Sequence, residues 1–147
     1  MNKKHWLPTV AMTTAFSLGA LVGTGIDQSG TAAARSTDRV FELRTYHALP
    51  GRLDALHSRF RDHTMRIFEK HGMTNIGYFS PQDEPLSDNT LIYIIAHENR
   101  EAAKANWQAF VADPEWKKVS EESQRDGRII ETLESVFMDP TDYSPMK

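Results

Sequence analysis

Three side chains with acid, base or hydrogen-bonding groups lie close together in the segment VFELRTYHALPG, residues 40–51. If this segment is a strand, its side chains alternate between two faces, so Glu42, Arg44 and Tyr46 share one face. A carboxylate, a guanidinium and a phenol in one row could line a reactive pocket, form a subunit contact or face water. Because burying either charge alone is costly, we interpret Glu42 and Arg44 first as an ion pair at a dimer face or a cavity rim.

Histidines are the other side chains suited to proton transfer near neutral pH. Those that follow residue 34 are His47, His57, His63, His71 and His97. His97 ends a strongly apolar segment, where a pocket mouth would lie, and we consider it and His63 as candidate bases. The chain has no cysteine and no pair of histidines at the i, i+4 spacing of a helical zinc site. We therefore predict no metal site, and nothing in the pattern points to a bound cofactor.

Hydrophobic periodicity predicts the elements that must position these residues. The expected strands are residues 39–47, 73–81, 90–98 and 128–139. The expected helices are residues 52–70 and 100–112, with a continuation over 114–125. Asn99 and Asp113 are predicted helix N-caps, and Pro114 at the first position of a helix strengthens the second start signal.

The order strand, helix, strand, strand, helix, strand predicts the fold class. Two split βαβ units form an α+β fold, a ferredoxin-like βαββαβ sandwich with a four-stranded antiparallel sheet. Helices would cover one face of this sheet. The segment TLIYIIAHE, residues 90–98, is apolar on both faces, so we expect a second copy of the chain to cover the open face in a homodimer.

The N-terminal segment has the layout of a secretory signal peptide. Two lysines precede a weakly apolar stretch over residues 7–25, and three alanines end at Ala34. We predict cleavage near Ala34 and a periplasmic or secreted protein, with an uncleaved N-terminal membrane anchor as the alternative. The predicted organisation is a signal peptide over 1–34, a linker over 35–38, one domain over 39–140 and a C-terminal tail over 141–147.

The charge of the remaining chain restricts its partners. Without residues 1–34 it has 15 basic and 19 acidic side chains, a formal net charge of −4. A mildly acidic domain is a poor partner for nucleic acid. It also has no second long apolar run and no basic amphipathic helix, so we expect no stable membrane insertion after cleavage.

Two longer motifs carry a family resemblance. VFELRTYHALPGRLDALHSRF and REAAKANWQAFVADPEWKKV together resemble the NIPSNAP family, and the resemblance extends over about residues 39–140. It implies membership of the dimeric α/β barrel superfamily, whose ferredoxin-like subunits pair through their sheets. That superfamily includes cofactor-independent monooxygenases, polyketide cyclases, lactone isomerases and haem enzymes, which use a cavity inside each subunit.

The leading functional hypothesis is an exported NIPSNAP-like protein that binds a small apolar or aromatic molecule in a cavity between sheet and helices. The candidate ligand-binding residues are Tyr46, His47, Tyr78, Tyr93 and His97. One alternative is a cofactor-independent monooxygenase or isomerase, in which His97 or His63 acts as the base and Arg44 or Tyr46 steadies an anion. Another alternative is a non-enzymatic interaction module that docks a partner through exposed helices.

Overall fold

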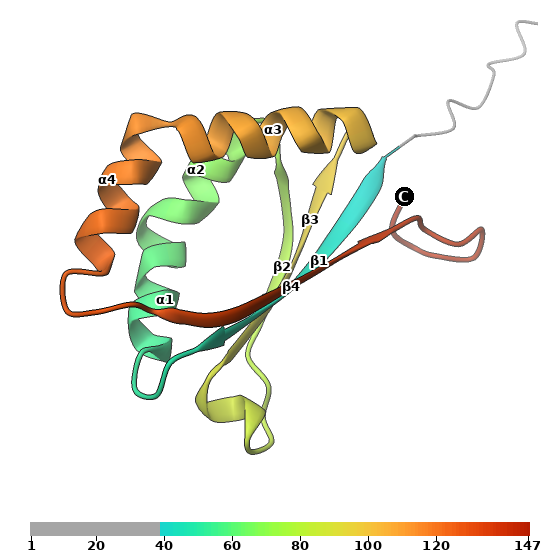
Figure 1. Cartoon of the computed structure of the whole chain (residues 1–147). Coiled ribbons are helices and arrows are strands. Elements are labelled where there is room, and N and C mark those ends of the chain that lie inside the picture. Colours follow the sequence, from blue (N-terminus) through green and yellow to red (C-terminus); the bar gives the residue numbers. More distant parts are fainter. Residues whose placement is uncertain (1–38) are drawn as a thin grey trace, which may run out of the picture. The chain divides into compact units, whose positions relative to one another are not determined.

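The computed structural model describes residues 39–147. The predicted signal peptide, residues 1–34, and the predicted linker, residues 35–38, lie outside the described residues. The described elements are β1 (Val40–Ala48), α1 (Leu53–Arg59), η1 (Phe60–Thr64), α2 (Met65–Lys70), β2 (Thr74–Phe79), η2 (Leu86–Asp88), β3 (Thr90–His97), α3 (Arg100–Ala112), α4 (Pro114–Ser123) and β4 (Ile130–Met138) (Figure 1). The order of strands and helices is the predicted one, and the boundaries differ by a few residues.

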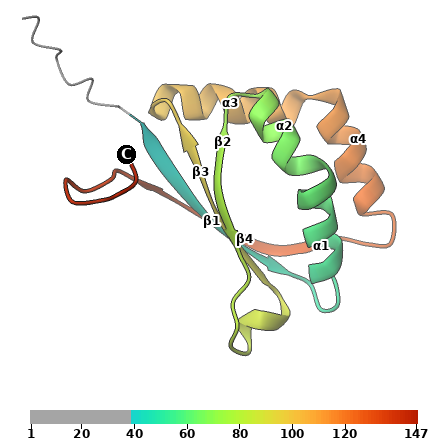
Figure 2. The same cartoon turned by 180° about the vertical axis from the view of Figure 1, so that it is seen from behind.

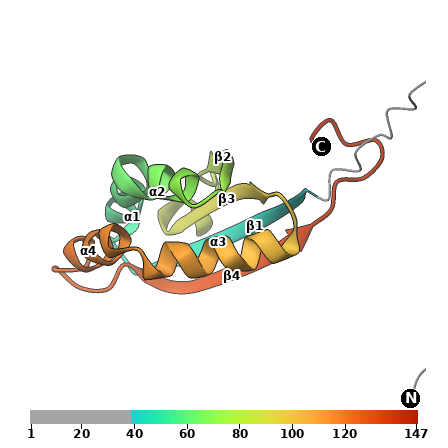
Figure 3. The same cartoon turned by 90° about the horizontal axis from the view of Figure 1, so that it is seen from above.

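The four strands form one sheet in the order β2-β3-β1-β4, and every neighbouring pair is antiparallel. Views from opposite sides show the helices gathered over one face of this sheet (Figures 1 and 2). The view from above shows α3 running across the strands (Figure 3). The predicted class, a ferredoxin-like α+β sandwich with a four-stranded antiparallel sheet, is confirmed.

One long helix spans α1, η1 and α2, and it differs from the regular helix that the sequence predicts. Its central turn, η1, is π-helical. The Thr64 hydroxyl donates a hydrogen bond to the Arg59 carbonyl at this turn, over 3.1 Å. π turns occur as single interruptions of α-helices, frequently at functional sites. The side chains that bury this helix against the sheet include Leu56, Phe60, Ile67 and Phe68.

Both predicted N-caps are confirmed. The side chain of Asn99 accepts a hydrogen bond from a first-turn amide of α3 over 2.7 Å, and Asp113 does the same for α4, whose first residue is Pro114. Asp113 also accepts from His71 at 2.6 Å and from Lys70 at 2.8 Å. These contacts hold the corner between α3 and α4 against the C-terminal end of α2.

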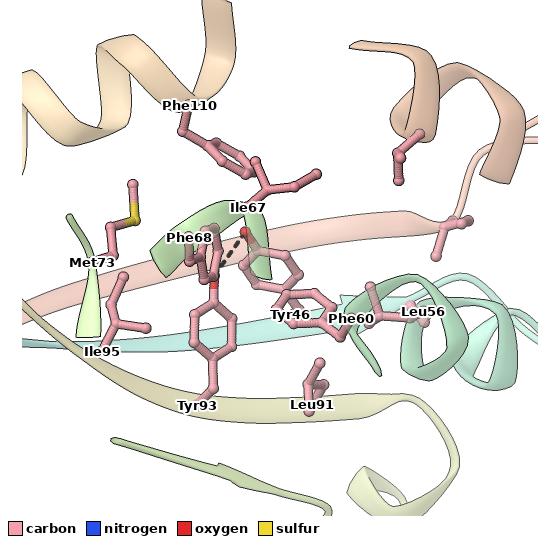
Figure 4. Packing of buried hydrophobic residues seen from close by; sticks show 13 residues of the cluster. Tyr46, Leu56, Phe60, Ile67, Phe68, Met73, Leu91, Tyr93, Ile95 and Phe110 are labelled. Carbon is pink, nitrogen blue, oxygen red and sulfur yellow. Dashed lines mark hydrogen bonds between the residues drawn. The ribbon is translucent and has the colours of Figure 1, made fainter. Parts of the chain in front are cut away.

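The core between sheet and helices contains five aromatic rings among aliphatic side chains (Figure 4). The ring centroids of Phe60 and Tyr93 are 5.0 Å apart, and those of Phe68 and Phe110 are 4.9 Å apart. Separations of this size are typical of favourable aromatic pairs. The core therefore joins all the helices to the central strands through a few large side chains.

The other face of the sheet keeps an apolar centre. Leu43 lies in register with Ile94 on one side and Val136 on the other. Val136 is 53% exposed and Phe79, at the end of β2, is 54% exposed. Ile94, on the segment that the sequence predicts to be buried on both faces, is only partly buried on this side. Large apolar side chains therefore remain accessible on the face without helices.

We predict that Asn99→Ala lowers the free energy of unfolding by about 1 kcal/mol, because the first turn of α3 then loses its side-chain acceptor. Asn99→Ser is the matched control, since a serine oxygen can cap the same amide. Chemical denaturation monitored by circular dichroism measures both variants. If the alanine and serine variants were equally stable, the cap would have no role in stability.

Candidate functional site

The row on β1 faces the helices. Glu42 and Tyr46 are 1% and 7% exposed, and Arg44 is partly buried between them. The guanidinium of Arg44 lies 4.2 Å from the ring centroid of Trp107 on α3, an arrangement that favours a cation–π interaction. The predicted Glu42–Arg44 ion pair is present, at 2.7 Å. The row lies between sheet and helices, so the alternatives of a dimer contact on the open face and of a row facing water are wrong.

The Glu42 carboxylate accepts hydrogen bonds from side chains on four elements. Arg44 of β1 and Trp107 of α3 each donate over 2.7 Å, and Ser135 of β4 donates over 2.6 Å. The Nε2 atom of His97, on β3, lies 3.1 Å from the second carboxylate oxygen. We name these five residues the Glu42 cluster. Each donor neutralises part of a charge that burial would otherwise leave isolated.

The environment of Glu42 favours its ionised form. Burial alone would raise the pKa of Glu42, but the hydrogen bonds from His97, Ser135 and Trp107 and the charge of Arg44 outweigh it and lower the pKa to about 2. Glu42 is therefore a carboxylate at neutral pH, and its lone pairs are occupied. These properties suit a structural anchor better than a proton acceptor.

A second polar group lies beside the cluster, at the tyrosine pair Tyr46 and Tyr93. Their hydroxyl groups point toward one another, 3.1 Å apart (Figure 4). Arg44 donates to the Tyr46 oxygen over 3.3 Å. Burial raises the pKa of Tyr93 well above its usual value, so this hydroxyl keeps its proton and acts as a hydrogen-bond donor.

A cavity of about 150 Å³ opens next to the Tyr46 ring. We name it the aromatic cavity. It is lined by Tyr46, Arg59, Phe60, Thr64, Phe68, Phe110, Trp116, Ser120, Gln124 and Ile130. These residues come from β1, the long α1–η1–α2 helix, α3, α4 and β4. The cavity thus lies within a single chain, between sheet and helices.

Among residues 39–147, Arg59 is the one charged residue that lines the aromatic cavity. It is 5% exposed, and its guanidinium carbon lies 5.4 Å from the ring centroid of Trp116. Within residues 39–147 no ion pair engages its side chain, and its Nε atom is buried without a partner. Burial lowers the pKa of Arg59. An arginine in this environment differs sharply from Arg44, whose charge is matched by Glu42.

The structure brings some of the predicted site residues together. Arg44, Tyr46, Tyr93 and His97 lie on the helix-covered face of the sheet, and the Tyr78 ring stacks on Tyr93 with centroids 5.3 Å apart. Of these candidates only Tyr46 lines the aromatic cavity.

The other two candidates lie elsewhere. His47 lies on the opposite face of β1, where its Nδ1 atom is 2.9 Å from the Thr90 hydroxyl. His63 is exposed and borders an outer groove of the long helix. Neighbouring residues of a strand face opposite ways, so Tyr46 and His47 cannot serve one pocket.

The sequence analysis identified neither Arg59 nor Trp116 as a cavity residue. The available signal for Arg59 was its position three residues after Leu56, on the apolar side of the predicted helix, where a charge is unusual. Its lack of a partner depends on residues distant in the chain. That property is visible only in the folded protein.

The described residues show neither a metal centre nor a membrane span. Between residues 39 and 147, no cluster of histidine and acidic side chains could hold a metal ion. None of the helices in this part of the chain is long and apolar enough to cross a bilayer.

Fold and site together define a ferredoxin-like α+β domain with an internal, aromatic-lined cavity. The NIPSNAP family profile matches residues 41–145, and the chain belongs to the NIPSNAP family. Comparison with curated proteins finds no match.

Solved structures of two NIPSNAP proteins share this fold. A NIPSNAP family protein of unknown function from Agrobacterium tumefaciens is 26% identical with a TM-score of 0.65, covering 76% of this chain and 96% of that chain. An uncharacterised NIPSNAP-like domain protein from Burkholderia xenovorans is 20% identical with a TM-score of 0.64, covering 74% and 90%. SnoaB, a cofactor-independent oxygenase from Streptomyces nogalater, is 16% identical with a TM-score of 0.49, covering 74% and 98%.

We predict that Glu42 makes the domain sensitive to acid. Its pKa is about 2 in the folded state against 4.5 for the free side chain, so the unfolded state binds the proton first as the pH falls. Its contribution, about 2 kcal/mol after a discount for solvent screening, is present above pH 4.5 and is lost between pH 4.5 and 2. Unfolding free energies of the wild type and of Glu42→Gln across this range measure the loss.

The expected result is a less stable Glu42→Gln variant with a weaker pH dependence in this range, since Arg44 then has no carboxylate partner. Glu121→Gln is the control, because Glu121 is exposed on α4. An unchanged pH dependence in Glu42→Gln would show that other carboxylates cause the acid sensitivity.

Proposed function

We propose that the domain binds a small aromatic molecule of about one ring in the aromatic cavity. The observation that carries this proposal is the wall of the cavity, in which Tyr46, Phe60, Phe68, Phe110 and Trp116 surround about 150 Å³. A cavity of about this volume can hold benzene when its walls are apolar. Ligand sites combine apolar surface with a few polar groups, and here the aromatic rings lie beside the polar side chains of Arg59, Thr64, Ser120 and Gln124.

The geometry favours binding over the alternative of catalysis by a pocket histidine. Among the described residues that line the aromatic cavity there is no histidine. The Nε2 atom of His97 lies within hydrogen-bond distance of the Glu42 carboxylate, and its Nδ1 atom lies 3.4 Å from the Asn106 amide nitrogen. A base needs to come within hydrogen-bond reach of the proton it removes, and His97 is engaged elsewhere.

We propose in addition that two copies of the chain pair through the open face of the sheet. Leu43, Ile94, Val136 and Phe79 supply apolar surface there, and a soluble domain seldom leaves such a centre uncovered. A second copy offers the same surface, as an isologous contact requires. The aromatic cavity lies on the other side of the sheet, so pairing leaves it complete within each subunit.

We predict that toluene, a neutral one-ring probe, binds in the aromatic cavity. The expected changes in amide chemical shifts would be centred on Phe60, Phe110 and Trp116, with a higher melting temperature in saturated toluene. Ser120→Leu, which fills the cavity, would abolish both effects.

Lys118→Leu is the matched control, because it adds the same side chain on the exposed side of α4. Toluene binding in this variant should equal that of the wild type. Absence of toluene binding in the wild type, or equal binding in Ser120→Leu, would contradict the proposal.

We predict that the wild type sediments as a dimer at micromolar concentration and that Val136→Lys sediments as a folded monomer. Val111→Lys is the control, since Val111 is 58% exposed on α3, away from the sheet. A monomeric wild type would contradict pairing through the sheet. So would a Val136→Lys variant that remains dimeric.

A further inference from the structure

We propose that the aromatic cavity takes a small carboxylate whose charged group pairs with Arg59, so that its ligand is an aromatic acid. This inference rests on the proposed function and adds the chemical class of the ligand. Three observations carry it: the guanidinium of Arg59 without an ion-pair partner among the described residues, the absence of acidic side chains from the cavity lining, and a tyrosine, Tyr46, on the same cavity wall.

The first observation is a buried charge without a counter-ion. Arg59 is 5% exposed and its Nε atom is buried without a partner, and no residue of 39–147 forms an ion pair with its guanidinium. Burying an unpaired cation is costly, and buried charges in proteins are ordinarily paired. The same layer contains a paired arginine, Arg44, so the fold can supply a carboxylate where the charge is structural. At Arg59 it supplies none.

The second observation concerns the polar groups that surround the guanidinium. None of the ten residues that line the cavity is acidic. The Thr64 hydroxyl already donates to the Arg59 carbonyl, and the Gln124 amide donates to the Ser120 carbonyl over 2.9 Å. Asp62, Glu122 and Asp126 border an outer groove that Arg59 also reaches, but none of the three forms an ion pair with it. The guanidinium of Arg59 therefore contributes a positive charge to the cavity, and no described acidic side chain pairs with it.

The third observation concerns Tyr46, on the same cavity wall as Arg59. The Tyr46 oxygen accepts from Tyr93 over 3.1 Å and from Arg44 over 3.3 Å. Apart from Tyr93, no described residue is placed to accept the proton of Tyr46. Tyr46 lines the same cavity as Arg59, so a ligand oxygen placed there can receive hydrogen bonds from both residues.

A carboxylate fits this arrangement better than other anions. A guanidinium is planar and donates two parallel hydrogen bonds to the two oxygens of a carboxylate. One arginine balances one negative charge, whereas a phosphate dianion would need more. The Trp116 ring, 5.4 Å from the guanidinium carbon, restricts the position of Arg59. The remaining walls are aromatic and suit the ring of the ligand.

Titration calorimetry with three one-ring probes tests this inference. Benzoate has the charge, benzamide has the same shape without it, and toluene has neither charge nor amide. We expect the wild type to bind benzoate at least about tenfold more tightly than benzamide, because hydrogen bonds to a charged group are the strong ones. Arg59→Met should lose this preference and still bind toluene. Arg61→Met, on the exposed side of the same helix, should behave as the wild type.

Each outcome decides between the two proposals. If toluene binds and benzoate binds no better than benzamide to the wild type, the carboxylate inference is wrong and the proposed function stands. If none of the three probes binds, both are wrong. The wild-type comparison needs no variant, so it remains decisive even if Arg59→Met fails to fold.

A second measurement separates a ligand-binding role of Arg59 from a structural one. Without ligand, the melting temperature of Arg59→Met should equal or exceed that of the wild type, because the unpaired buried charge is removed. Benzoate should raise the melting temperature of the wild type only. A large destabilisation of ligand-free Arg59→Met would assign Arg59 to stability and overturn the inference.

Discussion

The arrangement of this domain depends on one buried carboxylate. Glu42 receives hydrogen bonds from Arg44, His97, Trp107 and Ser135, which belong to three strands and one helix. These bonds fix α3 over the sheet, and α3 leads through its corner into α4. Since α4 carries one wall of the aromatic cavity, the shape of the cavity follows from contacts made at the far side of the helical layer. The anchor and the cavity are also joined directly, because Arg44 donates a hydrogen bond to Tyr46 on the cavity wall.

Arg44 and Arg59, the two arginines between sheet and helices, differ in whether their charge has a partner. Arg44 and Arg59 both lie near the tyrosine pair, and both contact a tryptophan ring. Arg44 pairs with the carboxylate of Glu42. No carboxylate within residues 39–147 pairs with Arg59. A protein can keep an unpaired buried charge when its partner arrives from solution, and it accepts lower stability in the free state as a result. The difference between the two residues is therefore more informative than either residue alone.

Local signals predicted the architecture well. Asn99 and Asp113 with Pro114 mark helix starts within a few residues, and strand alternation correctly placed Glu42, Arg44 and Tyr46 on one face. The alternation of side chains along a strand defines two faces, however, and does not predict which of them the helices cover. The partner of a side chain and the space beside it depend on residues far apart in sequence. For that reason the importance of Arg59 and the cavity itself could not be predicted.

The π turn gives the long helix a property of its own. Its buried residues Leu56, Phe60, Thr64 and Phe68 are spaced by four, and at 100° per residue such a row drifts by about 40° at each step. The extra residue of the π turn removes most of this drift, so that the row stays aimed at the sheet. A relative with a straight helix would be one residue shorter here. An alignment without a gap at this turn would then pair Arg59 or Phe68 with the wrong residue.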